Sequence, residues 1–169
     1  MEASNEVAEL LGQKLVKGDG SEVDFNTWYG SFKGEGKYIG LYYGAHWAPP
    51  SRLFTRNLKE KFYDPVKGTD QGKLIEVIFV SDDREADAFK RNVAQMPWFA
   101  IPFDQGLLMQ TLKSKFGVSE LPTFAIINAQ TGRLVKLEGR QDVFKGAKAF
   151  EDWDKLQWND MRVHNVLDS

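Results

Sequence analysis

Three short and almost wholly apolar runs place the strongest constraint on how this chain can fold. They span residues 38–43, 74–80 and 123–127. Runs of this length and composition are typical of strands buried on both faces of a sheet. Helical patterns lie between them, because Phe54, Leu58 and Phe62 recur every four residues and fall on one helix face. The order of strand, helix and strand predicts parallel pairing with a right-handed crossover.

Two turn signals predict antiparallel strands as well. Lys-Gly-Asp-Gly at residues 17–20 separates two short extended segments, which indicates a small N-terminal β-hairpin. Residues 128–132 separate the third apolar run from an alternating segment at residues 133–137, which indicates a second hairpin. We therefore expect an α/β fold with a mixed central β-sheet flanked by helices. One domain is expected over residues 1–158, followed by a polar C-terminal tail at residues 159–169.

Two further segments with apolar residues at helical spacing, called stripes here, carry signals for helix ends. Ser81-Asp82-Asp83 precedes a stripe at residues 86–93 and offers N-cap side chains for that helix. Gly117 follows a stripe at residues 108–116, where a glycine is the usual C-terminal cap. A last stripe begins at Ala149 and includes Trp153, which we expect to pack onto the sheet.

Composition excludes several classes of function. The 169 residues include no cysteine and two histidines, so we expect no disulfide, no metal site and no cofactor. A net charge of −2 predicts no nucleic-acid partner and no membrane partner. Residues 1–6 lack the features of a signal peptide, and no apolar run approaches the roughly 18–20 residues that cross a bilayer. We therefore expect a cytoplasmic location.

The junction of the first apolar run with its helix carries a recognisable motif. Residues 45–52 are Ala-His-Trp-Ala-Pro-Pro-Ser-Arg. This segment resembles the Trp-Cys-Pro-Pro-Cys-Arg motif of tryparedoxins and nucleoredoxins, with Ala48 and Ser51 at the cysteine positions. Three other segments resemble the same family, and the resemblance extends from about residue 10 to about residue 155. These segments are residues 79–83, residues 96–103 (Met-Pro-Trp-Phe-Ala-Ile-Pro-Phe) and residues 116–123.

The resemblance implies a thioredoxin fold with an added N-terminal hairpin. It also implies that the Leu121–Pro122 peptide bond is cis and faces the motif loop. From the residues alone, a trans proline entering a strand remains open. Trp98, within residues 96–103, is expected to lie in the core.

The family's activity is thiol–disulfide exchange, in which the first cysteine attacks and the second resolves the mixed disulfide. Ala48 has no nucleophile. The hydroxyl of Ser51 is not ionised near neutral pH and would need a positioned base to react. We expect Ser51 either to cap the helix or to lie passively in the former cysteine pocket, and His46 to be an ordinary loop residue. The chain as written therefore cannot perform the family's reaction.

A recognition surface remains after the cysteines are lost. It consists of Trp47, Pro49, Pro50, Leu121 and Pro122. An exposed aromatic residue beside a cis-proline loop can hold an extended protein or peptide partner. Simple packing of Trp47 on the motif loop is the equal alternative.

Two hypotheses follow. The first is a redox-inactive module that acts by protein binding. The second is a thiol–disulfide oxidoreductase seen as an engineered inactive variant. The two replacements differ, being alanine and serine, which favours natural loss. Arg56 and residues 152–154 depart from the tryparedoxin pattern and weaken a trypanothione-linked role. The identity of the partner and the oligomeric state stay open.

Overall fold

The computed structural model describes the backbone of residues 3–168 and the side chains of residues 6–160. The strands are β1 (Lys14–Val16), β2 (Glu22–Asp24), β3 (Tyr38–Gly44), β4 (Ile75–Ser81), β5 (Phe99–Ala100), β6 (Thr123–Asn128) and β7 (Leu134–Lys136). The α-helices are α1 (Ala3–Leu11), α2 (Phe25–Phe32), α3 (Pro49–Asn57), α4 (Asp64–Lys67), α5 (Ala86–Val93), α6 (Gly106–Phe116) and α7 (Ala149–Asp168). A π-helix η1 (Leu58–Tyr63) and two 3₁₀ helices, η2 (Asp70–Leu74) and η3 (Arg140–Lys148), complete the chain.

The strands form one mixed sheet in the order β2-β1-β5-β4-β3-β6-β7. Strand β4 is parallel to both β3 and β5, whereas β6 is antiparallel to β3. The predicted N-terminal hairpin is β1–β2, and the second predicted hairpin is β6–β7. The expected thioredoxin fold, with its mixed sheet between helices, is therefore confirmed.

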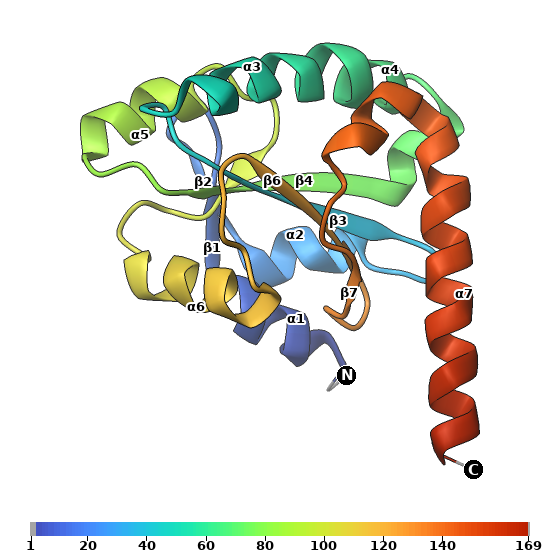
Figure 1. Cartoon of the computed structure of the whole chain (residues 1–169). Coiled ribbons are helices and arrows are strands. Elements are labelled where there is room, and N and C mark those ends of the chain that lie inside the picture. Colours follow the sequence, from blue (N-terminus) through green and yellow to red (C-terminus); the bar gives the residue numbers. More distant parts are fainter. Residues whose placement is uncertain (1–2, 169) are drawn as a thin grey trace.

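Strand β3 is buried along its whole length because helices cover both faces of the sheet. Figure 1 shows α1, α2 and α6 on one face, with α3, α4, α5 and α7 on the other. Successive β3 side chains alternate between two cores: Leu41 and Tyr43 pack toward the first face, and Tyr42 packs toward the second. The apolar face predicted for residues 54–62 packs in the second core. Gly117 is the C-cap of α6, with a φ of +69°, which confirms the predicted cap.

The helices that were not predicted from the sequence include α1 and α2, both on the first face of the sheet. Helix α1 packs Val7 and Leu11 into the first core. Helix α2 begins after Asp24, whose carboxylate accepts a hydrogen bond from the Thr27 N–H at 3.0 Å. Helices this short are marginal in isolation, so tertiary packing stabilises them more than local propensity does.

Helix α7 continues to Asp168, through the residues of the predicted polar tail, and the division of the chain at residue 158 stays a prediction. Residues 159–168 contain neither proline nor glycine, so the helical backbone can extend through them. The side chains of residues 161–169 lie outside the described part of the chain.

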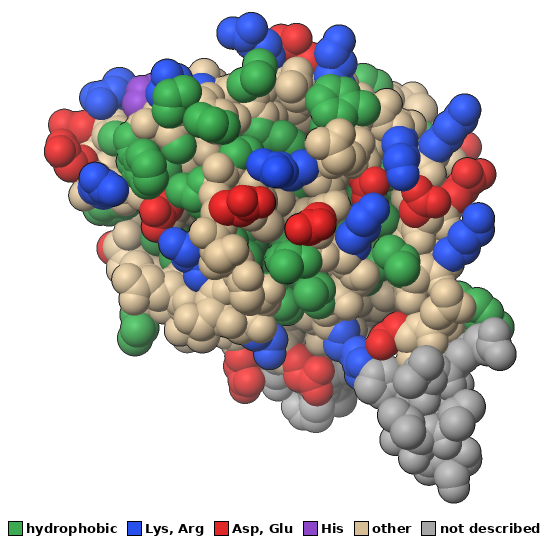
Figure 2. All heavy atoms as spheres, viewed as in Figure 1, with side chains coloured by type: hydrophobic (Ala, Val, Ile, Leu, Met, Phe, Trp, Pro, Cys, Tyr) green, Lys and Arg blue, Asp and Glu red, His purple; other side chains and the backbone are tan. Residues whose placement is uncertain are grey.

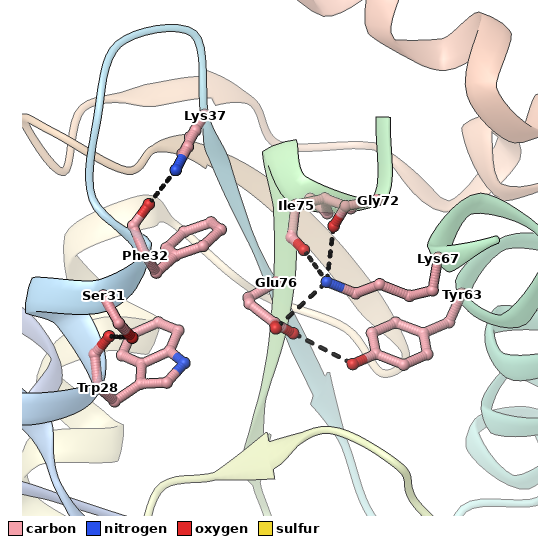
Figure 3. Close-up of polar contacts among 9 residues, drawn as sticks. All are labelled: Trp28, Ser31, Phe32, Lys37, Tyr63, Lys67, Gly72, Ile75 and Glu76. Atoms are coloured by element: carbon pink, nitrogen blue, oxygen red, sulfur yellow. Dashed lines mark hydrogen bonds and ion pairs between the residues drawn. The ribbon is translucent and has the colours of Figure 1, made fainter. Parts of the chain in front are cut away.

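An ion-pair network connects helix α4 to the beginning of strand β4 (Figure 3). The Lys67 ammonium donates hydrogen bonds to the carbonyls of Gly72 and Ile75 and lies 3.2 Å from the Glu76 carboxylate. Tyr63 donates a hydrogen bond to the same carboxylate at 3.1 Å. Because β3 and β4 are parallel, this network lies at the end of the sheet opposite the motif loop.

A search of the described residues for a helix with the length and apolar character needed to span a membrane finds none.

Candidate functional site

The motif loop connects the C-terminal end of β3 to the first turn of α3. Ala48 is the N-cap residue, with extended backbone angles and no side-chain capping bond. Pro49 and Pro50 occupy the first turn, where a missing N–H is tolerated and a fixed φ favours the helix. The loop therefore lies at the carboxyl edge of the parallel strands, where α/β proteins commonly place their sites.

Asp83, just after β4, holds the motif loop in place. Its Oδ1 accepts a hydrogen bond from the His46 main-chain N–H at 2.7 Å. Its Oδ2 accepts from the Ser81 hydroxyl at 2.8 Å and from the Asn92 amide at 3.2 Å. The prediction that residues 81–83 cap α5 is therefore wrong. The N-cap of α5 is Glu85, and the Asp83 carboxylate is directed toward the motif loop instead.

Trp47 is anchored although 47% of its surface is exposed. Its indole N–H donates a hydrogen bond to the Asp82 carbonyl at 3.0 Å. The Arg84 guanidinium lies over the ring, 4.7 Å from the ring centroid, which is within the range of a cation–π interaction. Trp47 therefore packs on the neighbouring loop while about half of its surface stays exposed, and its contact with a peptide stays a prediction.

Neither of the two positions aligned with cysteines carries a reactive group. Ala48 is buried, and Ser51 is only 1% exposed. Among the described side chains, the Ser51 hydroxyl finds no hydrogen-bond partner and no base that could activate it, and His46 Nδ1 is likewise buried without a partner. The prediction that Ser51 caps the helix is wrong, because the N-cap is Ala48 and Ser51 lies inside the first turn. The other prediction, that Ser51 lies passively in the former cysteine pocket, fits the structure.

Tyr42 on β3 holds the main chain at Ser51 by a hydrogen bond. The Tyr42 hydroxyl donates to the Ser51 carbonyl at 2.8 Å and lies 2.6 Å from the Thr55 hydroxyl. Burial raises the pKa of Tyr42 above its ordinary value of 10.0, so the phenol stays protonated. The start of α3 is thereby fixed to the centre of the sheet.

The second part of the predicted surface lies on the neighbouring strand. The Leu121–Pro122 peptide bond is cis. Because Thr123 pairs with Tyr43 on β3, this segment lies beside the beginning of the motif loop. Leu121 is half-buried, but Pro122 is buried, unlike the exposed Pro49 and Pro50. The Pro122 carbonyl accepts a hydrogen bond from Arg140 at 3.1 Å.

A small cavity separates Leu121 from the residues that anchor Trp47. Its volume is about 180 Å³. Its lining includes the apolar side chains of Val80, Met109 and Leu121 and the charged side chains of Asp82 and Lys113. Asp82 and Lys113 form an ion pair at 3.5 Å. The cavity therefore lies between Leu121 and the Asp82–Asp83 segment that holds the motif loop.

Sequence reasoning missed four residues of this site: Asp82, Asp83, Arg84 and Arg140. The first three form a charged run directly after a buried strand. Since β4 is parallel to β3, that run necessarily lies beside the motif loop, and this was the available signal. Among the side chains of residues 6–160, no group of three or more histidine, aspartate or glutamate residues could hold a metal ion.

A family model described as thioredoxin-like matches residues 36–134, more than half of the chain. The chain belongs to this thioredoxin-like family. Individual relatives place it with the nucleoredoxins and tryparedoxins, as the motif resemblance indicated.

The similarity extends through most of the chain. Nucleoredoxin from Bos taurus is 31% identical over 161 residues, which cover 95% of this chain and 34% of that protein. The chain thus spans about a third of the length of that relative. Tryparedoxin from Trypanosoma brucei brucei is 38% identical over 110 residues, covering 65% of this chain and 74% of that protein. A solved structure of tryparedoxin II complexed with glutathionylspermidine superposes with a TM-score of 0.71 at 30% identity, covering 85% of this chain and 94% of that one.

Proposed function

We propose that this chain is a redox-inactive module that binds a protein or peptide partner through the motif loop and the adjacent cis-proline segment. The surface consists of Trp47, Pro49, Pro50, Leu121 and Pro122. We propose further that the module acts in the cytoplasm, without a cofactor, and on neither nucleic acid nor membrane. One observation carries the proposal: Trp47 is anchored and half-exposed beside two positions that carry no thiol.

The geometry supports binding more than it supports chemistry. A fixed tryptophan and two exposed prolines offer contact area at a low cost in conformational entropy. The cavity beside Leu121 has room for a small apolar side chain of a bound peptide. Because Pro122 is buried, it contributes by setting the backbone conformation of the segment and not by side-chain contact. Tryparedoxin II has been solved with glutathionylspermidine, which gives a precedent for a ligand-bound member of the family.

A peptide selection tests the proposal. A phage-displayed library of random heptapeptides is selected on the immobilised chain, in parallel with a Trp47→Ala variant. We expect enriched peptides that bind the unmodified chain and lose binding to the variant by about tenfold or more, as at an aromatic hot spot. If no peptide is enriched on the unmodified chain beyond the level seen on the variant, the proposal fails.

The second candidate function is a thiol–disulfide oxidoreductase seen as an inactive variant. It is favoured by one observation: positions 48 and 51 stand at the start of a helix, one turn apart, as a reactive dithiol requires. The codons of the source gene at these positions decide between the hypotheses. Cysteine codons there would overturn natural loss, and alanine and serine codons would overturn engineering.

A further inference from the structure

Two arginines flank the exposed tryptophan of the motif loop. The Arg84 guanidinium stacks on the Trp47 ring at 4.7 Å, and Arg52 donates a hydrogen bond to the carbonyl of the preceding residue, His46, at 2.7 Å. Both arginines are exposed. Figure 2 shows basic side chains on both sides of the purple histidine, with hydrophobic side chains directly beside them.

Neither arginine has an acidic partner in the part of the chain that the structure describes. Within residues 6–160, no carboxylate forms an ion pair with Arg52 or Arg84. The exposed acids at the start of α5, Glu85 and Asp87, form none with them either.

The acids that lie closest to the loop are already engaged. Asp82 pairs with Lys113 at 3.5 Å, and Asp83 accepts hydrogen bonds from His46 and Ser81. Across the surface, Glu120 lies 3.8 Å from Arg140. The free positive charge of the site is therefore concentrated at Arg52 and Arg84, around the exposed ring of Trp47.

We propose that the partner is an extended acidic peptide segment, with an aspartate or glutamate seated at Arg52 and Arg84 next to an apolar residue on Trp47. This inference rests on the proposed binding function and names its ligand class. A guanidinium presents a planar fork of donors that matches a carboxylate, and stacking on an indole holds one such fork in a fixed orientation. Charge complementarity favours a protein over nucleic acid, because the positive charge is local and the chain carries a net charge of −2.

The peptides from the selection described above provide the test. The best binder is synthesised with its acidic residues intact and with each Glu or Asp replaced by Gln or Asn. Affinities are measured by fluorescence anisotropy at 50 mM and 300 mM NaCl against the unmodified chain, Arg84→Gln, Arg52→Gln and the control Lys73→Gln. Lys73 is an exposed base in η2, at the opposite end of the sheet.

We expect enriched peptides to contain acidic residues and to bind Arg84→Gln about twofold to fivefold more weakly, the range of one accessible ion pair. The neutralised peptide should bind all variants equally weakly, and Lys73→Gln should bind like the unmodified chain. Neutral enriched peptides that depend on Trp47 but not on Arg84 would overturn this inference and leave the proposed function standing. The absence of any enriched peptide would overturn both.

Discussion

The main-chain N–H of His46 donates a hydrogen bond to Oδ1 of Asp83 at 2.7 Å, which joins the loop after β3 to the loop after β4. The same carboxylate accepts from Ser81 and Asn92, so three donors depend on one side chain. Two adjacent parallel strands are thereby connected at the edge where the candidate site lies.

Asp83→Ala should therefore destabilise the fold and loosen the motif loop. The buried Ser81 and Asn92 and the half-buried His46 would lose their acceptor, and we expect the free energy of unfolding to fall by about 2 kcal/mol. Urea denaturation measures this loss, and hydrogen exchange at the His46 amide should accelerate. Asp87→Ala, an exposed acid on α5, is the matched control and should change stability by less than about 0.5 kcal/mol. Equal effects of the two variants would contradict the role of Asp83.

Ser51→Ala should stabilise the protein or leave its stability unchanged. The Ser51 hydroxyl is buried without a partner, and such a group costs about 1–3 kcal/mol when it is desolvated. Tyr42→Phe is the contrasting variant, since it removes the donor to the Ser51 carbonyl and should cost about 1–2 kcal/mol. Thermal denaturation of both variants checks the pair, and a clear loss of stability in Ser51→Ala would show that the hydroxyl has a partner.

Stability should fall at alkaline pH because buried tyrosines resist ionisation. Burial raises the pKa of Tyr42 and Tyr43 above the ordinary value of 10.0. Above pH 10 the unfolded chain loses these phenolic protons while the folded chain keeps them, so the unfolded state is favoured as pH rises. Each such group contributes up to about 1.4 kcal/mol per pH unit. Tyr43→Phe should therefore show a shallower decline than the unmodified protein in urea titrations between pH 9 and 11, and identical slopes would refute this cause.

Gly40→Ala should disrupt the centre of the sheet. A Cβ at Gly40 would lie 2.5 Å from two ring carbons of Phe124, so the core would have to shift. Overpacking of this kind costs about 1–3 kcal/mol. Gly30→Ala, in the exposed part of α2 with open space around it, should instead stabilise by about 0.5–1 kcal/mol. Chemical denaturation of the two variants should give effects of opposite sign.

Much of the fold could be predicted from local sequence. The apolar runs predict β3, β4 and β6 because strands buried on both faces need no polar alternation. Glycine-containing turns predict both hairpins. The short helix α2 could not be predicted in this way, since its stability depends on aromatic packing beneath the sheet.

The candidate site could likewise be predicted only in part. The motif itself identified Trp47 and the two positions without a nucleophile. The roles of Asp83 and Arg84 arise only when β4 is placed beside β3, because no short-range pattern connects them to residue 46 or 47. The burial of Ser51 likewise depends on Tyr42 and α3 meeting in the folded chain.

Ala48→Cys/Ser51→Cys should restore dithiol chemistry if the loop keeps the geometry that the family resemblance implies. The first thiol would stand at a helix N-terminus, which lowers a thiol pKa. We expect the double variant to accelerate insulin reduction by dithiothreitol, with Ala48→Cys alone as the control that lacks a resolving thiol. A folded but inactive double variant would count against the oxidoreductase alternative.

The central claim is that the motif loop and the cis-proline segment form one peptide-binding surface. The most direct test is a titration of the ¹⁵N-labelled chain with a selected heptapeptide, followed by amide chemical shifts. We expect the shifts to gather at the non-proline residues of 46–52, 82–84 and 120–123, and Trp47→Ala to abolish them. Shifts centred on α7 or on the β1–β2 hairpin, with these three segments unchanged, would contradict it.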